Sequence, residues 1–210
     1  MNKLLTVALG AAFAAASASA AAADANGAFF INAGIGQAQY HVGRTDGLGF
    51  KLDDKDTAGA LRFGYAWKVG NGFDLGVEGG YADLGKLVAK YNDGTTFAKT
   101  ELGAHGWLLG GNGKYRFDGN WFVSARAGWF RSEERMKAFA GDATTGAVTI
   151  YDSADDRGNG WYGGVGVGYD FAPNFSLGLN YDNYHAKATL EGASAAGNVG
   201  AYTVSAEYRF

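Results

Sequence analysis

The chain has 210 residues, a formal net charge of -3, and 47% hydrophobic and 15% aromatic residues, so it is neither disordered nor strongly charged. Glycine accounts for 35 residues, proline for 1 and cysteine for none, which excludes collagen, a disulfide scaffold, a thiolate zinc site and a cysteine nucleophile. The slightly acidic balance gives no basic footprint for nucleic acid, and we expect no such partner.

The first 23 residues predict a secretory signal peptide. Lys3 supplies the positive start, residues 4–13 form an apolar stretch, and small residues follow as far as Ala23. The apolar stretch is too short to span a bilayer. We expect cleavage near Ala23, which leaves residues 24–210 as the mature domain. The alternative is a buried alanine-rich helix.

After the signal, hydrophobic residues recur with a period of two, which predicts β-strands. In residues 57–69 the apolar and aromatic side chains fall on one face, and the other face carries Arg62, Lys68 and glycine. The same alternation recurs over residues 73–82, 161–171, 175–182 and 202–210. A soluble β-sandwich alternates in the same way. A polar face that mixes glycine with long charged side chains suits a narrow barrel lumen better than a soluble surface.

The connections between the predicted strands are unequal. Short turns fall at residues 70–72, 118–120 and 172–174, whereas longer polar segments occupy residues 41–56, 86–99, 131–157 and 185–198. Aromatic residues flank each short turn: Trp67 and Phe73, Phe117 and Trp121, and Phe171 and Phe175. Short turns, long loops and an aromatic girdle are typical of outer-membrane barrels.

These observations predict an all-β fold, namely an eight-stranded antiparallel transmembrane β-barrel with both chain ends in the periplasm. The eight strands are expected over residues 28–40, 57–69, 73–91, 99–117, 121–139, 148–171, 175–188 and 199–210.

The mature chain, over nearly all of its length, resembles the OmpA-like outer-membrane barrels, including the OmpX/Ail-type proteins. The likeness rests on residues 29–41, on residues 73–81, on the hairpin at 172–174 and on the ending Tyr208-Arg209-Phe210. It implies a place in the outer membrane of a Gram-negative bacterium, among outer-membrane lipid and lipopolysaccharide.

The last strand is similar to the C-terminal signal that the barrel-assembly machinery recognises in that family. The residues of this signal are Tyr202, Val204, Ala206, Tyr208 and Phe210. The alternative is an ordinary last strand that ends in phenylalanine.

The face predicted to line the lumen is rich in charge. Its polar members are Arg62, Lys68, Asp74, Glu78, Asn112, Lys114, Arg126, Asp182, Glu207 and Arg209. Buried charges must pair, so we expect a lumenal charge network in which Glu78 and Glu207 bridge to Arg62, Arg126 and Arg209.

The resemblance implies a second use for these charges, because in OmpA-like barrels a lumenal glutamate gates a narrow pore. Glu78 matches that glutamate and Arg126 a lumenal arginine, but Asn112 and Gly178 stand where the cationic partners would lie. A plug of salt bridges that stabilises the barrel is therefore favoured over a gate.

Catalytic and cofactor sites find little support in the sequence. His105 is predicted on the outer part of a lipid-facing strand with no serine placed near it, and His41 and His185 lie at strand ends. The acidic runs at 53–56 and 152–156 lack the spacing of a calcium site. The glycines of 163–168 lack the strand–turn–helix context of a dinucleotide loop. We expect no catalytic site, metal or cofactor, and hence no enzyme.

Two of the long segments, 88–97 and 139–151, have the pattern of hairpins, so the third to sixth strands are predicted to stand above the membrane as a protruding sheet. An exposed edge there can recruit an extracellular protein or surface ligand by strand addition, although the charged flank at 131–135 can equally face lipopolysaccharide. We expect a non-enzymatic envelope protein with an adhesin-like role through its outer loops. The alternative is a narrow, low-conductance pore gated by the lumenal salt bridges.

Overall fold

The computed structural model describes residues 26–41, 50–92, 95–117, 119–142, 144–145, 147–190 and 193–210. The predicted signal peptide lies outside the described residues. Within them, no helix has the length and apolar character needed to cross a membrane.

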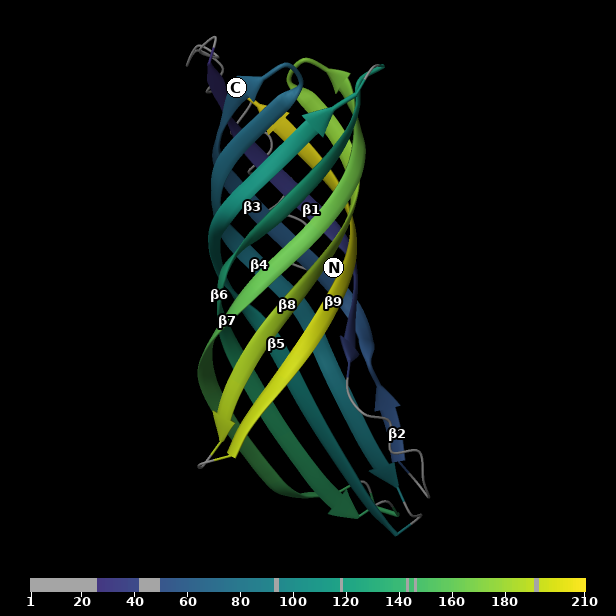
Figure 1. Ribbon diagram of the computed structural model, residues 1–210. Helices are drawn as coiled ribbons and strands as arrows, with labels where there is room; N and C mark the ends of the chain where they lie inside the picture. The colour runs from purple at the N-terminus through teal and green to yellow at the C-terminus, as the bar shows by residue number, and fades with distance from the viewer. Residues whose placement is uncertain are drawn as a thin grey trace.

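Antiparallel strands account for almost all of the described chain (Figure 1). They are β1 (Gly27–His41), β2 (Phe50–Asp53), β3 (Lys55–Gly70), β4 (Phe73–Asn92), β5 (Thr96–Arg116), β6 (Trp121–Asp142), β7 (Val148–Ala172), β8 (Phe175–Leu190) and β9 (Ala193–Arg209). The order β4-β3-β1-β9-β8-β7-β6-β5 is closed by pairing of β5 with β4. The predicted ring of eight antiparallel strands is thus confirmed. Closure gives the backbone polar groups partners within the ring, as a lipid environment requires.

The strand β2 was not predicted: it lies in the expected long segment 41–56, and Asp54 separates it from β3, which begins at Lys55. The Asp54 carbonyl accepts a hydrogen bond from the backbone N–H of Tyr40 at 2.9 Å. Beyond this point β2 pairs with residues 88–91 of β4. The strand β4 changes partner from β3 to β2 around Gly85, whose φ of +69° favours glycine. A Cβ atom at Gly85 would also lie 2.7 Å from the Thr57 carbonyl oxygen.

The outer surface of the ring is apolar, which is the reverse of a soluble sandwich. Phe63, Val77, Leu109, Val165 and Leu179 are each more than half exposed, because the period of two points them away from the lumen. The aromatic residues that flank the short turns are also exposed: Trp67, Phe73, Phe117, Trp121, Phe171 and Phe175. The soluble-sandwich alternative is therefore wrong, since it would bury this face.

Several strands are longer than a membrane requires. About 9–11 residues suffice to cross a bilayer, whereas β5, β6 and β7 have 21, 22 and 25 residues. Their outer parts form what we call the protruding wall: residues 83–92, 96–105, 133–142 and 148–157 of β4 to β7. Figure 1 shows these strands continuing past the β8–β9 hairpin at the end away from the C-terminus.

The predicted hairpins at 88–97 and 139–151 are confirmed, and strands extend through much of the expected long segments. Residues 86–92 pair with 97–103 across the β4–β5 hairpin, and Phe139 pairs with Tyr151 across the β6–β7 hairpin. The β8–β9 hairpin likewise continues from the pair His185 and Asn198 to the pair Leu190 and Ala193. Polar residues do not end a strand when at least one neighbouring strand still offers backbone partners.

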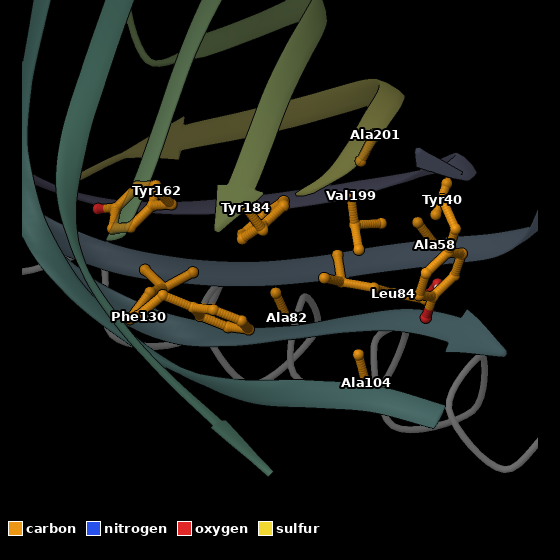
Figure 2. Packing of buried hydrophobic residues seen from close by; sticks show 12 residues of the cluster. Tyr40, Ala58, Ala82, Leu84, Ala104, Phe130, Tyr162, Tyr184, Val199 and Ala201 are labelled. Carbon is orange, nitrogen blue, oxygen red and sulfur yellow. The ribbon is translucent and has the colours of Figure 1, made fainter. Parts of the chain in front are cut away.

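The half of the lumen nearer the long-loop end is filled by apolar side chains (Figure 2). Phe130 meets Tyr184 edge to face with ring centroids 5.1 Å apart, and Tyr184 stacks on Tyr162 at 6.1 Å. We call this cluster the apolar septum; its members are Ala38, Tyr40, Ala58, Ala82, Leu84, Ala104, Leu108, Phe130, Tyr162, Tyr184, Val199 and Ala201. All eight strands of the ring contribute to it, and large side chains face alanines, so the cross-section is filled.

Candidate functional site

Between the septum and the short-turn end, the described lumen holds five cations and five anions in ion pairs. The cations are Arg62, Lys114, Arg116, Arg126 and Arg209, and the anions are Asp74, Glu78, Asp170, Asp182 and Glu207. Their formal charges cancel. The pairs fall into two layers, an upper tier beside the septum and a lower tier near the short turns.

Arg62 of β3 organises the upper tier. Its Nη2 donates hydrogen bonds to Asp182 Oδ2 at 3.0 Å and to the Tyr184 hydroxyl at 2.8 Å. Its Nε lies 3.9 Å from Glu78 Oε1. Because β1 and β9 lie between β3 and β8 in the ring, these bonds cross the lumen between strands that are not neighbours.

Glu78 and Arg126 complete the upper tier. The Glu78 carboxylate accepts hydrogen bonds from the Tyr162 hydroxyl at 2.8 Å and from Asn112 Nδ2 at 2.9 Å. Arg126 Nε lies 3.4 Å from Asp182 Oδ1, and Nη2 of the same residue donates to the Asn180 side-chain oxygen. Two septum tyrosines thus present their hydroxyl groups to the charges, which makes septum and upper tier one continuous structure.

The lower tier links the last strand to the rest of the barrel. Glu207 Oε1 of β9 lies 2.5 Å from Lys114 Nζ and 3.1 Å from Arg209 Nε. Arg209 Nη2 in turn lies 2.7 Å from Asp170 Oδ1. Arg116 bridges two carboxylates, with Nη1 2.6 Å from Asp74 and Nε 2.7 Å from Asp170.

The structure places the predicted network residues in partly different pairs. It brings Arg62 to Glu78 and Arg209 to Glu207. Arg126 lies against Asp182 instead of a glutamate. Lys68 was expected in the lumen but is exposed, because it lies at the rim, two residues before the short turn.

Sequence reasoning missed four members of the network. The residues not assigned to it are Arg116, Asp170, Tyr162 and Tyr184. Each lies on the face of its strand that points into the lumen, and the alternation along the strand could have identified it. Which residue meets which across the lumen depends on the stagger of the strands, which a single sequence does not specify.

The predicted assembly-signal residues lie on β9 and at its end. Tyr202 and Val204 are exposed on the outer face. The Phe210 backbone N–H donates to the Phe29 carbonyl at 2.9 Å, and the Phe210 ring packs edge to face on Tyr208 at 5.1 Å. The last residue thus contributes to the seam between β9 and β1.

The outer face of the protruding wall is also charged. The pairing of β4 to β7 puts Asp83, His105, Glu133 and Arg157 in one outward row. Glu133 lies 3.8 Å from His105 Nε2 and 3.3 Å from Arg157 Nε. His105, the one candidate base near lipid, is therefore paired with a carboxylate.

Above this row the wall carries a lysine pair around one acid. Glu101 lies 2.5 Å from Lys99 Nζ and 3.3 Å from Lys86 Nζ. The hydrogen bond from Lys99 lowers the pKa of the Glu101 carboxyl below its usual value.

One of the two acidic runs considered for calcium has a structural role. In the run at 53–56, the Asp56 carboxylate accepts the backbone N–H groups of Thr57 and Lys86, each at 2.7 Å. These bonds hold the end of β3 against β4. The side chains of the run at 152–156 lie outside the described residues.

The sequence profile of the family described as outer membrane protein beta-barrel domain matches residues 8–210. The chain belongs to this family. It is therefore a protein of the outer membrane of a Gram-negative bacterium, and the exposed apolar face described above is its lipid-facing surface.

Solved structures similar to this outer-membrane barrel include a protein named for attachment. Ail, the attachment invasion locus protein of Yersinia pestis, is 16% identical with a TM-score of 0.46, over 88% of this chain and 99% of Ail. OprG of Pseudomonas aeruginosa is 12% identical with a TM-score of 0.41, over 88% and 96%. The protease OmpT of Escherichia coli is 12% identical with a TM-score of 0.35, over 88% and 96%. No curated protein matches the sequence.

Proposed function

We propose that this outer-membrane barrel is non-enzymatic and acts in the cell envelope and in surface binding through its protruding wall. The open edge of β7 carries the proposal. Within the described chain, β6 pairs with β7 from Val148 onward, whereas β8 pairs with β7 only from Trp161. Residues 148–160 of β7 therefore present one edge without a strand beside it.

The open edge suits an extended peptide partner. At about 3.3 Å per residue its 13 residues span about 43 Å. Backbone N–H and C=O groups along such an edge accept an added strand, and the neighbouring side chains provide selectivity. We infer that the ligand is an extended segment of an extracellular protein.

Cations on the outer face support the part of the proposal that concerns lipopolysaccharide. Lys86 and Arg131 are exposed, and Arg131 lies in register with the aromatic residues Trp107 and Tyr81. Aromatic rings lie at the level of the lipid headgroups. Cations beside them are positioned to contact the phosphates of lipopolysaccharide.

Deleting residues 139–151 tests the surface role, because it removes the tip of the β6–β7 hairpin and shortens the open edge. The intact barrel and the deletion variant are each displayed on a non-adherent Gram-negative strain, and the cells that bind to surfaces coated with extracellular-matrix proteins are counted. The deletion is expected to remove at least 80% (roughly a fivefold drop) of the adherence that the intact barrel confers.

A matched control removes residues 188–195 of the β8–β9 hairpin, which lies at the same end but belongs to neither strand of the β6–β7 hairpin. It is expected to leave adherence unchanged. Full adherence of the 139–151 deletion, with folded barrel at the cell surface, would contradict the proposal.

The alternative of a low-conductance pore has less support. The lumenal charges cancel, so they offer no field that selects one sign of ion. The apolar septum also fills the cross-section beside the upper tier. We therefore assign the lumenal network a stabilising role.

The same proposal includes the route to the membrane. Residues 1–23 act as a signal peptide, the last strand is read by the barrel-assembly machinery, and both ends of the mature barrel lie in the periplasm. The presence of Gly27 and Phe210 at the short-turn end supports this orientation, because short turns face the periplasm in such barrels.

A further inference from the structure

The two halves of the lumen differ in their access to water. The exposed fraction of the lumenal side chains falls from 23% at Arg116 to 11% at Lys114 and 2% at Arg62. Deeper still, Phe130 and Tyr184 in the septum are at most 1% exposed. The accessible surface of the lumenal charges thus decreases from the short-turn end toward the septum.

A cavity of about 50 Å³ lies between the two tiers. Its lining combines the polar residues Asn32, Glu78 and Lys114 with the rings of Phe30 and Phe122. The Asn32 Oδ1 atom is buried and has no hydrogen-bond partner among the described protein groups. A cavity of this size holds about three water molecules, and one of them can satisfy Asn32.

The septum has the opposite chemistry. Its twelve residues come from all eight ring strands, and none of them is charged. The hydroxyls of Tyr162 and Tyr184 point to the charges of the upper tier, and that of Tyr40 donates to the Gly85 carbonyl at 3.1 Å. The septum thus offers a hydrated ion no free polar group, and such apolar constrictions exclude water.

We infer that the lumen is a blind vestibule: its polar half takes water and small polar solutes from the short-turn end, and the apolar septum closes it. The barrier is the septum and not the contact between Arg62 and Glu78. This inference concerns the inside of the barrel and is independent of what the protruding wall binds.

Thiol labelling tests this inference cleanly, because the chain has no cysteine. Ser124 and Ser132 both face the lumen from β6 and lie on either side of Phe130. Ser124 lines the cavity, whereas Ser132 is fully buried within the septum layer, where it pairs with Gly106 between the septum residues Ala104 and Leu108. Ser124→Cys and Ser132→Cys are each placed in three refolded backgrounds: wild type, Glu78→Ala, and Glu78→Ala with Phe130→Ala. The probe is a small, charged methanethiosulfonate reagent.

In wild type the thiol at position 124 is expected to react at least tenfold (about one order of magnitude) faster than the thiol at 132. The same ratio is expected in Glu78→Ala, because the septum remains. It should collapse to within about threefold when Phe130 is also removed. Leu84→Ala replaces Phe130→Ala if the latter does not refold.

Three results would overturn the inference. Fast reaction at 132 in Glu78→Ala alone would make the charged pair the barrier. Equally slow reaction at 124 and 132 in wild type would mean that no vestibule exists. Slow reaction at 132 after removal of both Glu78 and the septum side chain would place the barrier elsewhere.

Discussion

Asp182 holds two arginines with one buried carboxylate. Its two oxygens lie 3.0 Å from Arg62 Nη2 and 3.4 Å from Arg126 Nε, and the residue is 1% exposed. Removing the charge leaves Arg126 without its carboxylate and Arg62 with Glu78 alone at 3.9 Å, and an unpaired buried charge costs more than the pair contributes.

We predict that Asp182→Asn lowers the free energy of unfolding by about 3–5 kcal/mol. Urea unfolding of the refolded barrel in lipid vesicles, followed by tryptophan fluorescence, measures the change. Lys68→Gln is the control, because Lys68 is exposed at the rim, and its effect should stay within about 0.5 kcal/mol. Equal stability of Asp182→Asn and wild type would show that the upper tier does not hold the walls together.

At the residue scale the sequence predicted the face of a side chain better than its partner. The period of two put Arg62, Glu78 and Asp182 in the lumen, because alternate residues of a strand share a face. The alternation does not specify which side chains pair across the lumen. Arg126 was expected to pair with a glutamate, whereas it lies against Asp182. Pairs across a lumen depend on strand stagger, which cannot be read along one strand.

Gly85 shows how one residue shapes an element. It has a positive φ where β4 exchanges β3 for β2, and an added Cβ atom would lie 2.7 Å from both Asp56 and the Thr57 carbonyl. Gly79, on the same strand, has ordinary φ, and a Cβ atom there would have no neighbour closer than 3.8 Å.

We predict that Gly85→Ala destabilises the barrel by about 1–3 kcal/mol and detaches β2 from β4. Hydrogen exchange at residues 88–91 should quicken, since these residues pair with β2. Gly79→Ala should leave both the exchange and the unfolding free energy near their wild-type values. Unchanged exchange in Gly85→Ala would mean that the register shift does not require glycine.

At the element scale, the existence and order of the strands could be predicted, but their outer ends could not. The short turns were recognisable from Gly72 and Gly119, whose positive φ values match turn positions. The outer part of the β8–β9 hairpin extends past the predicted ends, because residues 185–190 and 193–198 lie in a polar segment and yet remain paired. Above a membrane both faces of a strand meet water, so polarity no longer separates strand from loop.

The whole molecule must close its ring at the seam between β1 and β9. Phe210 lies at this seam and, in the proposal, forms part of the assembly signal. We predict that Phe210→Ala reduces the amount of folded barrel in growing cells roughly fivefold or more, because in cells the assembly machinery must recognise the last strand before the barrel folds. Refolding of the purified variant in detergent should be unchanged. Heat-modifiable mobility in gels reports both quantities.

Phe171→Ala is the matched control, because Phe171 is an exposed aromatic residue at the same short-turn end that belongs to no assembly signal. It should assemble normally. Equal loss in both variants would assign the effect to the aromatic girdle and not to recognition of the last strand.

The central claim is that the barrel is closed and acts through its outer wall, and single-channel recording in planar bilayers tests it most directly. With insertion confirmed independently, the mature wild-type barrel and Glu78→Ala are both expected to be silent, because the septum persists in each. Discrete conductance steps in the wild type that change in Glu78→Ala would contradict the account and identify a pore governed by the lumenal charges.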